Sequence, residues 1–409
     1  MIQSVKRRKL FITVFLLAMA FCNVVLLLRE VSSLRNGYQD FTIYYMSALL
    51  LRSGQGADLY NSDTQYRAQL TFAHVPIRQG PLPFNHPPFE AIVFLPFTLL
   101  SYWPAYLLWT AINVIMLALS VVLLRRRFPR ILTSSPLVLG LGAAAFFPVA
   151  IAIVQGQDVV LLLLLFVLAV ICLDRGQDAT AGALLAGGLF RPHLIVPILV
   201  LLAVRRWRLL RGFVPAALVL VAMSVAITGW NGPHDYIQFV LHVEKTVCHG
   251  CFGPQTVPNL RGLFQDLPGL GASSRAATAL VLVSSLVIFF VALRRIWNGR
   301  DSIGFSSNLA VVTTLLVSFH LLTHDLILLL PLALILLTQS LDRQTVDRQS
   351  GDSQTKLFNG KLVLVSLLFL TPLYVFLLWQ VDQFFWFSLV LIWLYMILVL
   401  TPAPAEVPA

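Results

Sequence analysis

The stretch KRRKLFITVFLLAMAFCNVVLLL (residues 6–28) decides the class of protein. Four cationic residues precede a block from Leu10 to Leu28 that contains no charged side chain. A helix needs about 20 predominantly apolar residues to cross a bilayer. A secretory signal peptide would end in a small-residue cleavage site, whereas Arg29-Glu30-Val31 follows here. We therefore expect a retained membrane helix that begins in the cytoplasm.

The composition extends this interpretation to the whole chain. Of its 409 residues, 58% are hydrophobic and 11% are charged, against about 25% charged in soluble domains. The net charge is +11, but the basic residues lie at the ends of apolar blocks. These clusters are Lys6–Lys9, Arg125–Arg127, Arg205–Arg206 and Arg294–Arg295. Such placement follows the positive-inside rule and argues against a nucleic-acid partner. The sequence predicts an all-α polytopic membrane protein.

The apolar blocks predict about 12 transmembrane helices with both termini in the cytoplasm. Their ranges are 10–28, 104–124, 136–154, 158–174, 179–190, 193–204, 210–228, 275–293, 307–321, 325–338, 361–378 and 384–400. The segment 88–101 is too short to span comfortably, and we expect a juxtamembrane or re-entrant helix there. This topology places 20 of the 29 Lys and Arg residues inside, as the positive-inside rule requires.

One integral membrane domain is predicted over residues 1–400, in the cell (inner) membrane. Its outer loops are residues 29–87 and 229–274, and residues 41–51 of the first loop could form a short amphipathic helix. Residues 401–409 are rich in Pro and Ala and are expected to be a disordered tail.

The histidines mark one face of the predicted membrane domain. All eight fall in outer loops or at outer helix ends: His74, His86, His193, His234, His242, His249, His320 and His324. Histidine is the side chain that most readily titrates near neutral pH. The outer face is therefore expected to carry the chemistry.

Five polar elements share this outer face. They are Gln39-Asp40-Phe41 with Tyr44-Tyr45, Asn85-His86-Pro87-Pro88-Phe89-Glu90, Gln155-Gly156-Gln157-Asp158, Arg191-Pro192-His193, and Pro258-Asn259-Leu260-Arg261 with Ser318-Phe319-His320 and Thr323-His324-Asp325. Together they predict a polar cavity with one candidate base, cationic groups and amides. Such a cavity suits a sugar-phosphate ligand whose lipid tail lies along the helices.

Each of these residues also has a structural interpretation. Asp40 and Asp158 are each suited to capping the helix that follows, and Arg191 is long enough to reach a lipid phosphate. His320 and His324 lie four residues apart, on one face of a helix. A zinc site there lacks a clear third ligand, so no metal site is predicted.

Six segments, taken in order, resemble a known family. They are DFTIYYMSALLLRSGQGADLY from residue 40, NHPPFEAIVFLPFTLL, GQDVVLLLLL, GALLAGGLFRPHLIVPILVLL, PNLRGLF and SFHLLTHDLILLLPL. The ordered set resembles glycosyltransferase family 87, and within it the polyprenyl-phosphate-mannose-dependent alpha-mannosyltransferases of GT-C membrane fold. The resemblance covers about residues 36–338.

The resemblance implies a glycosyl transfer on the extracytoplasmic face with inversion at the anomeric carbon. The donor would be a polyprenyl-monophosphate sugar and the acceptor a glycolipid or a glycan. Membrane lipids would surround the protein, and no cofactor is expected. It assigns the general base to Asp40 and a functional histidine to His320 or His324. The family commonly has Lys-Pro at Arg191-Pro192 and Tyr-Pro-Pro at His86-Pro87-Pro88. The substrate-binding residues expected are Tyr44, Tyr45, His86, Gln155, Gln157, Arg191, His193, Asn259, Arg261, His320, His324 and Asp325.

Two other classes are compatible with a polytopic chain. A transporter or lipid flippase would place polar residues near the bilayer midplane, whereas the predicted span interiors here are nearly free of charge. A non-catalytic assembly subunit would leave Asp40 dispensable. The one-sided distribution of polar groups favours an enzyme that receives its substrate from the membrane.

Overall fold

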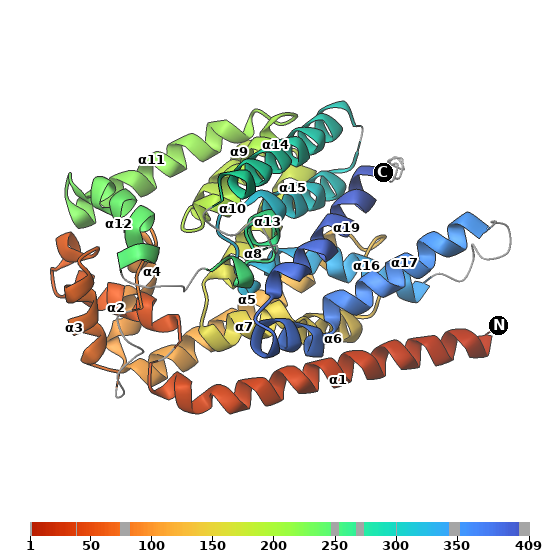
Figure 1. Cartoon of the computed structure of the whole chain (residues 1–409), viewed down its shortest axis with the longest axis horizontal. Coiled ribbons are helices and arrows are strands. Elements are labelled where there is room, and N and C mark those ends of the chain that lie inside the picture. Colours follow the sequence, from red (N-terminus) through yellow and green to blue (C-terminus); the bar gives the residue numbers. More distant parts are fainter. Residues whose placement is uncertain are drawn as a thin grey trace.

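The computed structural model describes residues 2–37, 39–73, 82–246, 253–266, 274–299, 301–342 and 352–400. The tail 401–409, His74 and His249 lie outside the described residues. Every regular element in the described ranges is helical (Figure 1), and this confirms the all-α class.

The α-helices are α1 (Ile2–Arg35), α2 (Phe41–Arg52), α3 (Ser62–Leu70), α4 (Glu90–Phe94), α5 (Tyr102–Arg127), α6 (Pro136–Ala145), α7 (Phe147–Gln155), α8 (Val159–Asp174), α9 (Asp178–Gly187), α10 (Pro192–Ala203), α11 (Leu209–Thr228), α12 (Gly232–Thr246), α13 (Leu260–Gln265), α14 (Arg275–Asn298), α15 (Ile303–Val317), α16 (Leu330–Asp342), α17 (Asp352–Phe369), α18 (Thr371–Val375) and α19 (Ser388–Leu400). The 3₁₀ turns are η1 (Gly56–Asp58), η2 (Leu95–Leu99), η3 (Pro254–Thr256), η4 (Thr323–Leu329) and η6 (Phe384–Phe387), and η5 (Phe376–Gln380) is a π-helical turn.

Several of these helices are long and apolar enough to cross a membrane. Within the described residues there are five, and seven if each of two sharply bent pairs, α6–α7 and α17–η5, counts as one span. Only 6% of the apolar window of α11 and 11% of that of α14 is buried, so both present apolar surface outward, as lipid contact requires. The protein is therefore a polytopic membrane protein, and the total of 12 spans stays a prediction.

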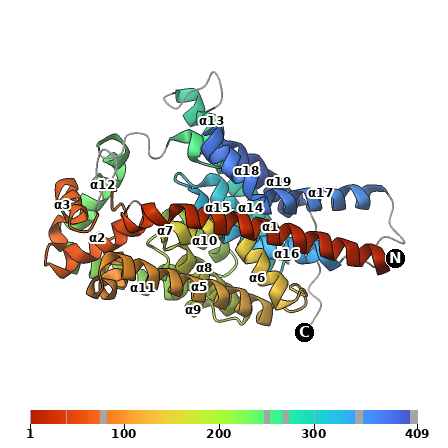
Figure 2. The same ribbon diagram turned by 90° about the horizontal axis from the view of Figure 1, so that it is seen from below.

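Helix α1 runs along the length of the molecule, from its start at the right of Figure 1 to α2 and α3 at the left, and Figure 2 shows the same course. It continues to Arg35, beyond the predicted end at Leu28. In its middle, the Asn23 Nδ2 donates to the carbonyl of Ala144 at the α6–α7 break (2.9 Å). The Asn23 Oδ1 accepts from the Thr371 hydroxyl at the α17–α18 break (2.9 Å). One buried amide thus bonds to both helix breaks. A break in a helix at membrane depth leaves backbone groups without their helical hydrogen bonds, and these groups need partners within the protein.

Helices α9 and α11 pack together through glycine. A Cβ on Gly182 would collide with the carbonyl of Leu209, and one on Gly212 would collide with the carbonyl of Ala179. Small residues at both positions let the two backbones approach closely, which is typical of helix pairs in membranes. Helix α9 ends at Gly187, and α10 begins at Pro192, so the chain makes two short helices here, as predicted.

The segments beside the site differ from the sequence-based expectation in two places. Helix α2 is not amphipathic, because nine of its twelve residues are buried beneath an aromatic cluster that includes Phe94, Tyr102 and Tyr106. Helix α15 ends at Val317, short of the predicted end at 321. The non-helical residues 318–322 that follow carry His320.

Candidate functional site

A cavity of about 500 Å³ lies where the polar elements meet. Its wall includes nine of the predicted site residues, namely Asp40, His86, Gln155, Gln157, Arg191, His193, Arg261, His320 and His324. These come from six separate stretches of chain, between residues 40 and 324. Polar residues that are distant along the chain thus line one cavity, and their roles in binding stay a prediction.

The Asp40 carboxylate is held by an amide across the cavity wall. Asp40 precedes α2, but its side chain makes no capping hydrogen bond, so the capping interpretation is wrong for this residue. The Gln157 Nε2 donates to the Asp40 Oδ2 (2.5 Å). The Gln157 Oε1 accepts from the Tyr44 hydroxyl (2.8 Å) and from Arg191 Nη2 (2.5 Å). Because Tyr44 and Arg191 both donate to the amide oxygen, the amide nitrogen of Gln157 must face Asp40. The hydrogen bond from this nitrogen then sets the orientation of the Asp40 carboxylate.

A left-handed turn after α7 delivers Gln157 to this position. Gly156 adopts φ +62°, and a Cβ there would lie 2.8 Å from the Cβ of Phe41. Glycine is the residue that adopts this conformation without cost. Helix α5 anchors the turn, because Trp109 Nε1 donates to the carbonyl of Gly156 (2.9 Å) and Asn113 Nδ2 donates to that of Gln157 (3.2 Å). The turn therefore belongs to the packed core and not to a mobile loop.

Arg191 is an internal ion-pair partner. It is 4% exposed, which makes the lipid-phosphate interpretation wrong. Its Nη2 lies 2.7 Å from Asp158 Oδ1, and its Nη1 lies 3.6 Å from Asp325 Oδ1. The Arg191 Nη2 also donates to the Tyr44 hydroxyl (3.2 Å). A buried charge of this kind is tolerated only when paired and hydrogen-bonded.

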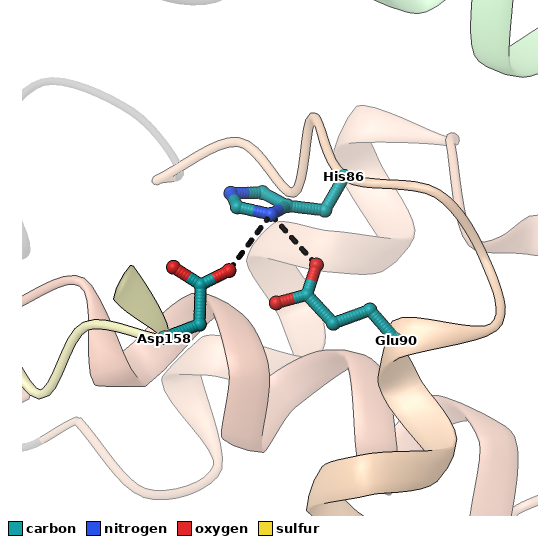
Figure 3. A group of neighbouring side chains, drawn as sticks. All are labelled: His86, Glu90 and Asp158. Carbon is teal, nitrogen blue, oxygen red and sulfur yellow. Dashed lines mark ion pairs between the residues drawn. The ribbon is translucent and has the colours of Figure 1, made fainter. Parts of the chain in front are cut away.

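His86 faces two carboxylates, as Figure 3 shows. Its Nδ1 lies 2.7 Å from Glu90 Oε2 and 3.7 Å from Asp158 Oδ2. Burial, together with the positive charge of Arg191, lowers the pKa of His86 to about 3. Burial raises the pKa of Asp158, but the positive charge of Arg191 outweighs burial and holds that pKa below its ordinary value. His86 is therefore neutral and Asp158 ionised at neutral pH.

Another part of the cavity wall is rich in imidazole. The His193 and His320 rings are 5.6 Å apart and nearly perpendicular. Burial, followed by the charges of Arg191 and Arg261, lowers the pKa of His320 to about 3. His324 Nδ1 lies 2.8 Å from Gln155 Oε1. The guanidinium of Arg261 lies over the ring of Phe319 (4.4 Å) and donates to its carbonyl (3.2 Å). This wall combines neutral imidazoles with one guanidinium.

Four predicted binding residues lie behind the cavity wall. The Tyr44 ring is fully buried, and the Tyr45 hydroxyl donates to the carbonyl of Leu100 (2.7 Å). Asn259 caps α13 and donates to the carbonyl of Ser318 (2.5 Å). The Asp325 Oδ2 accepts from the amide of Leu322 (2.8 Å). In this structure these residues support the wall and do not line it.

Sequence reasoning missed other residues of the site. Glu90 and Asp158 were quoted within motifs but not assigned to the site, and Tyr236 and Trp379, which line the cavity, were not singled out at all. An acidic residue at the start of an apolar segment, as Glu90 is, was a usable signal because such residues are expensive in a membrane protein. No sequence signal marked Tyr236 or Trp379.

Fold and site together define a polytopic membrane protein with a polar cavity that gathers one half-buried carboxylate, amides, imidazoles and guanidinium groups. The model of glycosyltransferase family 87 matches residues 84–318, more than half of the chain, and the chain belongs to this family. It is therefore a membrane glycosyltransferase, with a sugar donor and an acceptor as its substrates. No curated protein and no solved structure matches the chain.

The matched region does not contain all of the cavity. Asp40 precedes it, and His320 and His324 follow it, yet all three line the same cavity as residues inside the match. Family membership also favours an enzyme over the transporter, flippase or assembly-subunit alternatives.

Proposed function

We propose that this chain transfers a sugar, mannose by its family resemblance, from a polyprenyl-monophosphate donor to an acceptor hydroxyl in the cavity, with inversion at the anomeric carbon. The observation that supports this most is Asp40, the carboxylate of the cavity wall that Gln157 holds in place (2.5 Å). A carboxylate in hydrogen-bond reach of a hydroxyl is suited to general-base catalysis.

In the proposed step the acceptor hydroxyl gives its proton to Asp40 as its oxygen attacks the anomeric carbon. The new C–O bond forms opposite the bond to the donor phosphate, which breaks and releases polyprenyl phosphate. One displacement of this kind inverts the anomeric configuration and needs a single carboxylate. Two carboxylates in the geometry of a glycosidase are not required.

The histidine-rich wall supports the placing of the donor phosphate. Arg261 carries a positive charge there, and His193, His320 and His324 line the same cavity. Donors aimed at the charge that develops on a leaving group stabilise the transition state. Arg191 is a weaker candidate than the sequence predicted, because Asp158 and Asp325 already compensate its charge. We assign no cofactor to the chemical step.

We further propose a GT-C architecture in the cell (inner) membrane, with both termini cytoplasmic and the cavity on the extracytoplasmic side. Among the described residues, Arg191 and Arg261 are the basic residues of the cavity wall. The arginine clusters 125–127, 205–206 and 294–295 do not contribute to it. The positive-inside rule then favours the opposite, cytoplasmic side for those clusters. A glycolipid or glycan acceptor would enter from outside or from the outer leaflet.

The experiment is transfer of mannose from polyprenyl-phosphate mannose by purified wild type and Asp40→Asn, with the anomeric configuration of the product read by NMR. Asn has the size of Asp but accepts no proton. We expect inverted product from wild type and a rate lower by about 10²- to 10⁴-fold in the variant. Asp58→Asn, an exposed acid in η1, is the matched control and should retain full activity.

Three results would contradict this proposal. Equal rates in wild type and Asp40→Asn would remove Asp40 from the mechanism. Retained anomeric configuration would exclude a single displacement. Turnover of a nucleotide sugar, with none of any polyprenyl-phosphate sugar, would overturn the donor class.

A further inference from the structure

The cluster in Figure 3 is a set of metal-ligand side chains that the proposed chemistry does not use. His86 precedes α4, Glu90 is the first residue of α4, and Asp158 precedes α8. Their Nδ1 and carboxylate oxygen atoms all lie within 4.8 Å of one another. Exposure of the three residues is 6%, 1% and 1%, respectively. Three ligand-type groups from two distant stretches of chain thus converge in the interior.

The carboxylate oxygens of this cluster lack ordinary hydrogen-bond donors. Within the described residues, no backbone amide, hydroxyl or side-chain amide donates to either oxygen of Glu90 or to Oδ2 of Asp158. A neutral His86 offers one proton at Nδ1, and this proton satisfies only one of these oxygens. Buried polar atoms in native proteins nearly always have a partner, and an ion is one of the accepted explanations where none is visible.

Acidic groups outnumber cations around this cluster. Glu90, Asp158 and Asp325 are three buried acidic side chains, and Arg191 is the cation paired with the last two of them. Among the described residues no ion pair joins Glu90 to an arginine or a lysine, and its partner is His86. A bound cation would supply the positive partner that Glu90 lacks.

The distances suit a small divalent cation. Zinc binds imidazole nitrogen and carboxylate oxygen at about 2.0–2.2 Å, so neighbouring ligands of a tetrahedral site are about 3.4 Å apart. The observed separations from His86 Nδ1 are 2.7 Å to Glu90 and 3.7 Å to Asp158, which bracket that value. The Asp158 Oδ1 remains paired with Arg191, an outer contact of the kind that orients metal-bound carboxylates.

We propose that His86, Glu90 and Asp158 bind one divalent cation of the zinc type, beside the cavity and not within its chemical step. The cation would cross-link the segment before α4 to the start of α8. Coordination through Nδ1, the nitrogen that lies beside both carboxylates (Figure 3), would fix the ring of His86. Because His86 lines the cavity, the ion would also fix part of the cavity wall.

Zinc binding is measured on the purified full-length chain without a polyhistidine tag, so the result does not depend on the proposed transfer reaction. The protein is treated with a chelator, desalted, incubated with zinc chloride and passed through gel filtration. Bound zinc is quantified by mass spectrometry, and thermal unfolding is recorded with and without zinc. We expect about one zinc per chain and a rise in Tm of at least about 2 °C.

Two variants locate the site. Glu90→Gln keeps the shape of the side chain but removes its charge, and it should weaken zinc binding by at least about tenfold. Asp235→Asn changes the exposed His234–Asp235 pair on α12 and should bind as wild type does. Equal affinity in wild type and Glu90→Gln would overturn the proposal. Zinc-free wild type with an unchanged Tm would overturn it as well.

X-ray absorption spectroscopy of zinc-loaded wild type gives an independent result if Glu90→Gln does not fold. A shell with one imidazole and carboxylate oxygens supports the assignment. A shell of several imidazoles would place the ion among His193, His320 and His324 and would overturn it.

Discussion

Two walls of the same cavity are built on different principles. The aspartate wall consists of Asp40, Gln157 and Arg191, with Tyr44 and Asp158 directly behind them. Its members bond mainly to one another, through contacts such as Gln157 with Asp40 (2.5 Å) and Arg191 with Asp158 (2.7 Å). A closed network of this kind holds each group in one orientation.

The histidine wall consists of His193, Arg261, Phe319, His320 and His324. Within the described part of the chain, the Nε2 atoms of His193 and His324 are buried without a hydrogen-bond partner. The two walls therefore differ in bonding: the groups of the aspartate wall bond to one another, whereas the imidazoles of the histidine wall are not all bonded.

The largest expected loss of stability follows from removing Arg191, the cation of the aspartate wall. Arg191→Met leaves Asp158 and Asp325 without their partner, and breaking a buried pair in this way costs about 3–5 kcal/mol. Thermal unfolding in detergent measures the change. Arg206→Met is the control, because Arg206 pairs with Asp178 but is 38% exposed, and it should cost about 1 kcal/mol or less. Similar losses in both variants would show that Arg191 does not hold this wall together.

The turn that carries Gln157 comes next. In Gly156→Ala the left-handed backbone costs about 1–2 kcal/mol, and the collision with Phe41 adds about 1–3 kcal/mol. Gly176 has a similar φ of +72° with nothing within 4 Å of a Cβ, so Gly176→Ala isolates the backbone cost. The comparison is made on Tm and on transfer rate. Equal destabilisation by both substitutions would mean that Phe41 yields, and that the turn does not fix the aspartate wall.

Removal of the amide that holds Asp40 should lower the transfer rate as well as the stability. Gln157→Leu deletes the hydrogen bonds to Asp40, Arg191 and Tyr44, and a hydrogen bond to a charged group is worth about 1.5–3 kcal/mol. We expect kcat to fall by about 10- to 100-fold, with little change in KM. Asn23→Leu is the control, since Asn23 is buried and bonds to Ala144 and Thr371, and none of these three residues lines the cavity. It should lower Tm but leave kcat unchanged. The opposite pattern would assign Gln157 a purely structural role.

The histidine wall should make the smallest contribution to the free energy of unfolding, and this contribution should depend on pH. His320 has a pKa near 6.5 when unfolded and about 3 when folded. Between these two pKa values the unfolded chain binds a proton at His320 and the folded chain does not. The free energy of unfolding is therefore highest above pH 6.5 and declines as the pH falls toward 3. The loss is at most about 1.4 kcal/mol per pH unit. Unfolding of wild type and His320→Gln at pH 7, 6 and 5 measures it. The curve of the variant should be flatter, and parallel curves would show that His320 is accessible to protons when folded.

The residue types of the cavity wall were predictable from sequence, but their contacts were not. Arg191 shows the difference. Its place at a break between two apolar segments marked it as functional, whereas its pairing with Asp158 and Asp325 depends on residues 33 and 134 positions away. Asp40 is a second case, because a helix-capping role was reasonable from local sequence, and the Gln157 amide that holds it lies 117 positions along the chain.

The sequence by itself determined that this is an all-helical membrane protein, because long uncharged blocks with basic ends are stable only as helices in a bilayer. It also determined the ordered motifs that carry the family resemblance. Only the tertiary structure decided that Tyr44, Tyr45, Asn259 and Asp325 stand behind the cavity wall. It alone joined His86, Glu90 and Asp158 into one cluster. The physical reason is that hydropathy and helix periodicity are local properties of the chain, whereas the partner of a buried charge is fixed by how distant helices pack.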